Sequence, residues 1–307
     1  MYLGFDTSNY TTSFAVFDGE RIIVNNKKLL TVKDGERGLR QSDAVFQHTL
    51  NMPELIEDSN CNDFKIDAVA VSSRPRNVEG SYMPCFLVGI NNAVCAAKVT
   101  NANLYYTSHQ IGHILAALYS ADQLELIYQR FIAFHVSGGT TEALLIEPDK
   151  NDIIKATVIA QSSDLKAGQA VDRAGVMLGL GFPCGKELDS LSLESKREFK
   201  HKISMNGLNC SLSGIENKAH KMFDNNESRE DIAKFVITYI CDTLDKMTEL
   251  ILQKYGNLPL IFAGGVMSNT IIKEKLTEKY NAYFAQPQFS CDNACGTAIY
   301  AYLKDRK

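Results

Sequence analysis

The sequence predicts an α/β fold made of two domains. Buried strands alternate with amphipathic helices along the chain, a pattern typical of parallel sheets that carry ligand groups at their strand ends. A strand, a small-residue loop and a second strand occur at residues 1–17 and again at 131–146, which indicates either duplicated domains or a chance likeness of two hairpins. The length of 307 residues also favours two domains.

The first domain is predicted to begin with the first copy of this unit. Met1 to Asp6 has the pattern of a buried strand, and Ser13 to Phe17 forms the returning strand after a loop of small hydroxyl residues. Strand and helix signals then alternate as a parallel sheet requires. Strands are expected at 21–25, 66–71 and 104–107, and helices at 41–56 and 86–98.

Two histidines stand at the start of the next predicted helix. His109 and His113 are four residues apart in an apolar-periodic segment that continues to Leu118. Side chains at this spacing share one face of a helix, so the two imidazoles can hold a metal. A zinc protease is not favoured, because Gln110 stands where the H-E-x-x-H motif needs a glutamate as general base.

The second copy of the repeated unit contains a candidate phosphate loop. Phe131 to Val136 is a predicted buried strand, and Ser137-Gly138-Gly139 turns it back into the strand from Glu142 to Ile146. A Ser-Gly-Gly turn at a strand end leaves backbone N–H groups for phosphate oxygens.

The remaining elements continue the alternation. Asp164 is expected to cap a helix that contains Asp172, and a long amphipathic helix is expected at 232–254. The other signals predict strands at 153–160, 258–263 and 282–285, glycine-rich or small-residue loops at 178–186 and 209–215, and helices at 269–280 and after 293.

Two positions in this part have two readings each. Gly264 and Gly265 follow an apolar strand, where they suit either close approach to a nucleotide or tight packing of strand against helix. Asp292 precedes the last helix, as either a third metal ligand or a simple N-cap.

Composition limits the class of protein. With 45% hydrophobic and 22% charged residues the chain can bury a large core, and no apolar run reaches the roughly 18 residues of a membrane span. We therefore expect a cytoplasmic protein with no membrane contact and no signal peptide. The eight cysteines lack C-x-x-C spacing and are expected to be reduced thiols. A net charge of −4 does not favour an autonomous nucleic-acid binder, so any RNA contact should be local.

Motifs along nearly the whole chain carry a family resemblance. The sequence resembles the threonylcarbamoyltransferase family, formerly called glycoproteases, which is related to the sugar kinases, Hsp70 and actin. The matching marks are Asp6-Thr7-Ser8, Arg74-Pro75 with Val88-Gly89, His109 and His113, Val136 to Gly139, the segment 164–172, Ser211 to Gly214, Ala263 to Val266 with Asn269, and Asp292-Asn293.

The resemblance implies a duplicated, actin-like, Hsp70-like and sugar-kinase-like (ASKHA) α/β fold, with a nucleotide cleft between its two halves. The first half is expected at 1–107, completed by a C-terminal helix at 294–307. The second half is expected at 108–293, where it would contain the metal and nucleotide sites.

The same resemblance assigns roles to particular residues. It implies one divalent metal, iron or zinc, on His109, His113 and Asp292, and an adenine nucleotide of the ATP or AMP type, or an acyl-adenylate. The first loop would supply the catalytic candidates, which are Asp6, Ser8, Asn9 and Thr11. The nucleotide contacts would be Ser137, Gly138, Gly139, Gly168, Asp172, Gly185, Gly264, Gly265 and Asn269.

The implied activity is transfer of a threonylcarbamoyl group from its adenylate to N6 of an adenosine in tRNA. Members of the family usually act with partner subunits, so we expect a hetero- or homodimer through the N-terminal half, with tRNA as a further partner. The metal would polarise the carbamoyl oxygen and position the anhydride.

The chain departs from the family pattern at several polar positions. The family's first loop carries two acids, whereas this chain has Asn9, Tyr10 and Thr11 in that loop. Ile111 replaces a glutamate between the histidines, and Gln169 replaces another glutamate. These differences leave two alternatives open: a paralogue with a different carbamoyl acceptor, or a non-catalytic nucleotide-binding partner protein.

Overall fold

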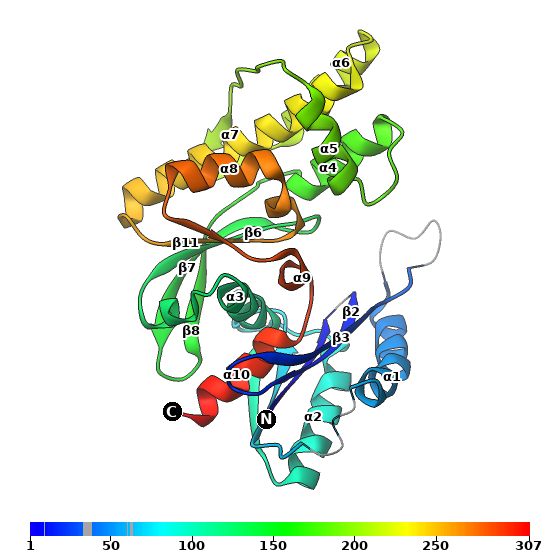
Figure 1. Ribbon diagram of the computed structural model, residues 1–307, viewed down its shortest axis with the longest axis vertical. Coiled ribbons are helices and arrows are strands. Elements are labelled where there is room, and N and C mark those ends of the chain that lie inside the picture. Colours follow the sequence, from blue (N-terminus) through cyan, green and yellow to red (C-terminus); the bar gives the residue numbers. More distant parts are fainter. Residues whose placement is uncertain (9, 33–38, 60, 62–63) are drawn as a thin grey trace. The chain divides into compact units, whose positions relative to one another are not determined.

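The chain forms two compact units (Figure 1). The structure is a computed structural model, and it describes residues 1–8, 10–32, 39–59, 61 and 64–307. Unit 1 contains Met1–Ile127, Pro148–Ala156 and Gln288–Lys307, and unit 2 contains Tyr128–Glu147 and Thr157–Pro287. These units differ from the predicted boundary at residue 107, because the segments that carry His109, His113 and Asp292 all pack within unit 1.

Unit 1 is built on a five-stranded mixed sheet in the order β3-β2-β1-β4-β5. β1 pairs antiparallel with β2 and parallel with β4, while β4 pairs parallel with β5. The bounds of these strands are β1 Tyr2–Ser8, β2 Thr11–Phe17, β3 Ile22–Leu29, β4 Ala68–Arg74 and β5 Asn103–Ser108.

The first hairpin is tighter than the sequence predicted. Thr7 pairs with Thr12 and Ser8 with Thr11, so most of the expected hydroxyl loop is strand. Threonine has a β-branched side chain that suits a pleated sheet, which explains why these polar residues extend the strands. The hydroxyl groups of Thr7, Ser8, Thr11 and Thr12 therefore stand in strand positions.

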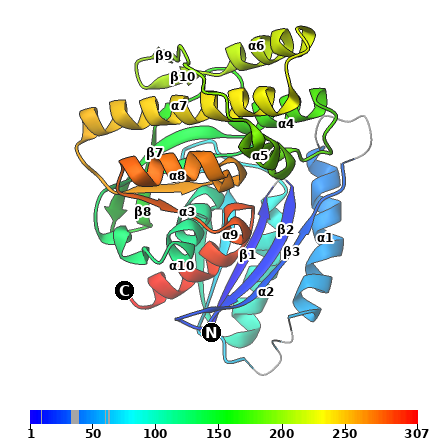
Figure 2. The same ribbon diagram turned by 45° about the horizontal axis from the view of Figure 1, so that its top comes forward.

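Four helices pack against the two faces of this sheet. α1 (Gln41–Glu57) and α2 (Phe86–Thr100) lie on one side, and α3 (His109–Ser120) and α10 (Cys295–Asp305) lie on the other (Figures 1 and 2). A short 3-10 helix follows α3 at Leu124–Tyr128. The core between the sheet and the first pair of helices consists of Leu3, Phe5, Phe14, Val16, Val24, Met52, Leu55, Val69, Val71, Ala93 and Ala97.

Glycines permit the close approach of α10 to the rest of unit 1. A Cβ on Gly296 would collide with the carbonyl oxygen of Gly112 in α3, and a Cβ on Gly4 would collide with the carbonyl oxygen of Ala294. No residue with a side chain fits at such backbone contacts. These contacts fix the segment before α10, including Asp292, against the start of α3.

Unit 2 repeats the strand arrangement of unit 1. Its sheet has the order β12-β11-β6-β7-β8. If the strands of each sheet are counted from the first one in that sheet, both sheets have the order third, second, first, fourth, fifth, read from β3 in unit 1 and from β8 in unit 2. β6 again pairs antiparallel with the next strand and parallel with the fourth. The duplication is therefore confirmed. The bounds are β6 Phe131–Val136, β7 Thr141–Asp149, β8 Ile153–Gln161, β11 Leu260–Ala263 and β12 Ala282–Phe284.

Helices cover the sheet of unit 2 over a large apolar core. The predicted long helix is α7 (Arg229–Tyr255), whose buried residues join strands β6 and β11 in one cluster. In the described part of the chain, no helix is both long and apolar enough to cross a membrane. The other elements are α4 Ala167–Met177, α5 Gly185–Glu194, β9 Ser204–Asn206, β10 Asn209–Ser211, α6 Ser213–Asp224, a 3-10 turn Gly265–Ser268, α8 Thr270–Lys279 and α9 Pro287–Ser290.

The predicted capping role of Asp164 is wrong. α4 begins at Ala167 with Lys166 as its N-cap. The Asp164 carboxylate instead accepts hydrogen bonds from the Ser211 hydroxyl at 2.6 Å and the Leu212 backbone N–H at 2.8 Å. It therefore links the segment before α4 to the start of α6, a partner that local sequence could not reveal.

Candidate metal centre and nucleotide loops

His109, His113 and Asp292 converge in unit 1. The Ser108 hydroxyl accepts a hydrogen bond from the Ile111 N–H and caps α3, so both histidines lie in its first two turns. His113 Nε2 lies 3.0 Å from Asp292 Oδ1 and 3.0 Å from His109 Nε2. The three ligand atoms all lie within 4.8 Å of one another, a spacing that can hold a metal ion.

The donor chemistry of this cluster fits iron or zinc. Two imidazole nitrogens and one carboxylate oxygen are ligands that both metals accept. The N-cap reading of Asp292 is not supported, because Ala294 is the N-cap of α10 and makes no side-chain cap. The Asp292 side chain is directed at His113 instead.

Asp6 lies behind the cluster and holds one of its histidines. His109 Nδ1–H donates to Asp6 Oδ2 at 2.8 Å, and Asp6 is only 1% exposed. Burial raises the pKa of Asp6, but the neighbouring His109 outweighs burial and the net pKa is lowered. Burial lowers the pKa of His109, and attraction to Asp6 reverses this and raises it to about 10. A metal ion bound here would replace the proton on Nε2, while the Asp6 carboxylate on Nδ1–H keeps the ring oriented toward the ion.

The first hairpin brings two hydroxyl residues to the same cluster. The Thr11 hydroxyl donates to Asp292 Oδ2 at 3.3 Å. Ser8 pairs with Thr11 across the hairpin, and its Oγ is buried with no hydrogen-bond partner among the described residues. A buried hydroxyl normally has a partner, so this atom fits contact with a bound ligand or water. The predicted catalytic residue Asn9 lies outside the described residues.

The candidate phosphate loop in unit 2 closes on itself. Ser137 N–H donates to the Thr140 carbonyl at 2.7 Å, and Thr140 N–H donates to Ser137 Oγ at 3.2 Å. A Cβ built on Gly138 or Gly139 would meet nothing within 4 Å. One side of the loop is therefore open along its backbone.

The remaining predicted glycines divide into two kinds. Gly168 and Gly264 are packing positions, since a Cβ on Gly168 would lie 2.5 Å from Gly138 N and one on Gly264 would collide with Val136. Gly264 also has φ +102°, which favours glycine. Gly265 has open space where a Cβ would stand. The packing reading therefore describes Gly264, while the nucleotide reading stays a prediction for Gly265.

Asp172, Gly185 and Asn269 lie around helix α5 and the start of α8. Asp172 Oδ1 accepts from the Cys184 N–H at 3.0 Å, directly before Gly185. Asn269 caps α8 by accepting from the Ile272 N–H at 3.1 Å, while its amide donates to Asp189 in α5 at 2.7 Å. All the predicted nucleotide residues belong to unit 2, where the side chains of Asp172 and Asn269 fix helix ends.

Comparison with known proteins identifies the family. The profile of tRNA N6-adenosine threonylcarbamoyltransferase (TsaD) matches residues 42–299. The chain belongs to this family.

Named relatives agree with this assignment over most of the chain. The tRNA N6-adenosine threonylcarbamoyltransferase of Kosmotoga olearia is 31% identical over 83% of this chain and 77% of its own length. The protein of the same name from Thermosipho africanus is 29% identical over 99% of this chain and 94% of its own length. The chain, as a member of the threonylcarbamoyltransferase family, is an enzyme of the transferase class.

A solved structure supports the fold assignment. The ROK family glucokinase of Streptomyces griseus superposes with a TM-score of 0.53 at 12% identity, covering 98% of each chain. At this identity the likeness concerns the fold alone. The threonylcarbamoyltransferase family member described here therefore has the predicted two-domain ASKHA fold.

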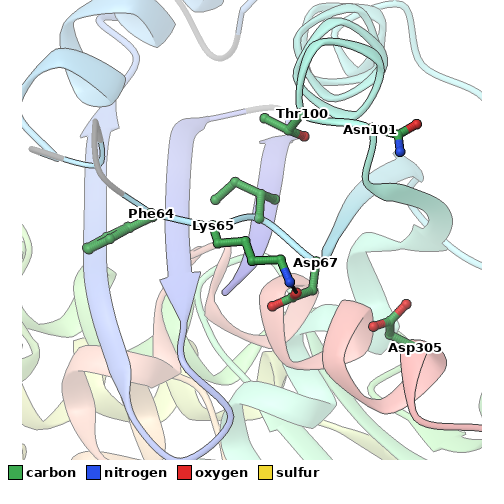
Figure 3. A pocket seen from close by; sticks show the side chains of 7 residues that line it. Phe64, Lys65, Asp67, Thr100, Asn101 and Asp305 are labelled. Atoms are coloured by element: carbon green, nitrogen blue, oxygen red, sulfur yellow. Dashed lines mark ion pairs between the residues drawn. The ribbon is translucent and has the colours of Figure 1, made fainter.

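A separate pocket lies at the other end of the sheet of unit 1. It has a volume of about 530 Å³ and is lined by Phe64, Lys65, Ile66, Asp67, Thr100, Asn101 and Asp305 (Figure 3). Asp67 forms an ion pair with the Met1 ammonium at 2.6 Å, and Asp305 accepts from Asn103 at 2.8 Å. Since these carboxylates already have partners and lie before β4 and at the end of α10, we assign the pocket no part in the threonylcarbamoyltransferase site.

Helix α5 and its residue Asp189 were missed by sequence reasoning. The glycines at 179, 181 and 185 suggested only a loop. Asp189 accepts hydrogen bonds from Asn269 at 2.7 Å and from the Thr270 hydroxyl at 2.9 Å, so it connects α5 to α8. The i, i+3 spacing of the apolar residues Leu188 and Leu191 was the available signal, but it is short and weak.

Proposed function

We propose that this chain transfers a threonylcarbamoyl group from its adenylate to N6 of an adenosine in tRNA, with one metal held by His109, His113 and Asp292. The observation that carries the proposal is the convergence of these three side chains with Asp6 hydrogen-bonded behind His109. The family assignment supports the reaction class.

The residues of unit 1 have distinct tasks in this proposal. A bound iron or zinc ion would act as a Lewis acid on the carbamoyl oxygen. Asp6 accepts the hydrogen bond from His109 Nδ1–H and so orients the ring with Nε2 toward the position of the metal. Thr11 donates to the Oδ2 atom of Asp292, which leaves Oδ1 directed toward the histidines. Ser8 Oγ remains to bind the donor or the acceptor.

The loops of unit 2 are proposed to bind the adenine nucleotide part of the donor. The open backbone at Gly138, Gly139 and Gly265 allows phosphate oxygens to approach N–H groups. Gly168 and Gly264 support these loops by permitting close packing beneath them. Asp172 in α4 and Gly185 at the start of α5 are the proposed ribose contacts.

A partner subunit is proposed to bind the outer face of α1. Phe46 and Leu50 are four residues apart and are 63% and 59% exposed, so they form an apolar pair on one helical face. Such a pair on a solvent-facing helix fits a protein interface. This is the N-terminal contact expected for a hetero- or homodimer.

A single-turnover assay with threonylcarbamoyl-adenylate and bulk tRNA tests the proposed reaction. Metal-loaded protein, with and without an extract that supplies partner subunits, should form threonylcarbamoyladenosine. Adenylate hydrolysis without a tRNA product would replace this proposal with a different carbamoyl acceptor. Donor binding without any turnover would replace it with a non-catalytic binding role.

A further inference from the structure

A buried histidine on α1 contacts the hairpin that carries Thr11. His48 is 0% exposed and lies in the middle of α1. The inward-facing residues of this helix are Ala44, His48, Asn51, Met52 and Leu55, which follow the helical period. A lone histidine on the buried face of a helix more often has a structural than a catalytic role.

The hydrogen bonds of His48 define which nitrogen carries its proton. Nε2 lies 2.9 Å from the Ser8 carbonyl oxygen, which can only accept, so Nε2 carries the hydrogen. Nδ1 lies 2.7 Å from the Thr12 hydroxyl and accepts from it. Asn51 Nδ2 in turn donates to the same Thr12 oxygen at 3.2 Å. Burial lowers the pKa of His48, in keeping with a neutral ring.

This ring joins the two strands of the hairpin close to its turn. Ser8 belongs to β1 and Thr12 to β2, and the Ser8–Thr11 and Thr7–Thr12 pairs are the last two of the ladder. Successive residues of a strand point to opposite faces, so Thr12 faces α1 while Thr11 faces the metal cluster. Thr11 there donates to Asp292. His48 is thus connected to a proposed metal ligand through one pair of adjacent strand residues.

We propose that His48 is a positioning residue for the metal centre: it fixes the end of the first hairpin so that Thr11 and Ser8 stand beside Asp292. This inference rests on the proposed function for its catalytic consequence. Its structural consequence, the ordering of the hairpin, does not. A histidine that only filled the core would affect stability but neither the hairpin nor the metal.

Three variants separate these roles. His48→Phe keeps a flat ring but removes both hydrogen bonds. His48→Gln restores an amide donor for the Ser8 carbonyl. Met52→Ala, a fully buried position one turn further along the same face, serves as a matched core control: Met52 shares the apolar core with Phe5 and Phe14 of the hairpin strands but makes no hydrogen bond to the end of the hairpin. Each protein is measured at a temperature that lies the same number of degrees below its own midpoint of thermal unfolding, so that differences in global stability do not affect the comparison.

Three measurements are made on each protein: deuterium exchange of the strands at 2–8 and 11–17, the dissociation constant of Zn²⁺ in competition with a chromogenic chelator, and kcat and KM in the transferase assay. We expect His48→Phe to accelerate exchange at the end of the hairpin and to weaken Zn²⁺ binding roughly 10-fold, the low end of the range for outer-shell changes. kcat should fall more than KM changes. His48→Gln should recover much of each loss, and Met52→Ala should lower only the unfolding temperature.

Equal hairpin exchange and equal Zn²⁺ affinity in His48→Phe and Met52→Ala would overturn the inference. If the native chain neither binds Zn²⁺ nor transfers the group, the proposed function fails. The exchange measurement then still decides whether His48 orders the hairpin, so the two failures are distinguishable.

Discussion

The Asp6 carboxylate accepts a 2.8 Å hydrogen bond from the imidazole of His109, which lies 103 residues away in the chain. The Asp6 side chain is buried. Asp6 lies in β1 and His109 begins α3, so the pair links the sheet to the helix that carries both histidines. The pair places the second nitrogen of His109 beside His113 and Asp292. It is the structural basis for the metal proposal.

The metal ligands give the first prediction. His109→Ala and His113→Ala should each lose most of the bound metal, because two remaining ligands hold a divalent ion poorly. Elemental analysis after gel filtration measures the metal content. His220→Ala, an exposed position on α6, is the control. If both site variants keep the metal content of the native protein, the proposed metal centre is refuted.

Asp6 gives a second prediction. Asp6→Asn keeps the shape of the side chain but removes the charge that orients His109, so metal affinity should fall by about 10- to 100-fold. Titration with Zn²⁺ against a chelator checks this, with circular dichroism to confirm folding. An unchanged affinity would mean that Asp6 does not act through His109.

Gly138 gives a third prediction, which concerns the nucleotide. Ligand at about a hundredfold excess over its dissociation constant should stabilise the native fold by about 2.7 kcal/mol, seen as a thermal shift with ATP, ADP or AMP. Gly138→Val should abolish the shift without unfolding unit 2, because its Cβ would meet no atom of the chain within 4 Å. Gly168→Ala, whose Cβ would strike Gly138, should instead destabilise the protein without ligand. A thermal shift of native size in Gly138→Val would exclude this loop from nucleotide binding.

Asp164 gives a fourth prediction, which concerns acid stability. Burial raises the pKa of Asp164, but hydrogen bonds from Ser211 and Leu212 outweigh burial and hold it well below its ordinary 3.8. A folded-state pKa below the unfolded value gives stability that is present above pH 4 and lost as the pH falls below it. Urea unfolding between pH 7 and pH 3 should show less acid dependence in Asp164→Asn than in the native chain. Parallel curves would refute this.

The exposed pair on α1 gives a fifth prediction. Leu50→Ser should weaken association with a second subunit without lowering stability, since Leu50 is 59% exposed. Light scattering coupled to gel filtration measures the complex, alone and with a partner extract. Leu29→Ser, at a 75% exposed residue of β3, is the control. Identical behaviour of the two variants would place the interface elsewhere.

Local periodicity was sufficient to predict most elements of the fold. The strand at 131–136 and the long helix at 232–254 were found because apolar residues recur at the period of their own element. The two histidines were recognised for the same reason, as their spacing is a property of one helix. α5 was missed because its ten residues carry few apolar positions and follow several glycines.

The sequence by itself determined the alternation of strands and helices, the repeated hairpin and the residue types of the metal cluster, because each is encoded within a short segment. Only the tertiary structure decided that Asp6 stands behind His109, that Thr11 reaches Asp292 from 281 residues away, and that Gly264 packs while Gly265 stays open. These relations depend on strand register and on how closely backbone segments within the same unit approach one another. No local pattern encodes such contacts, because packing between distant segments sets them.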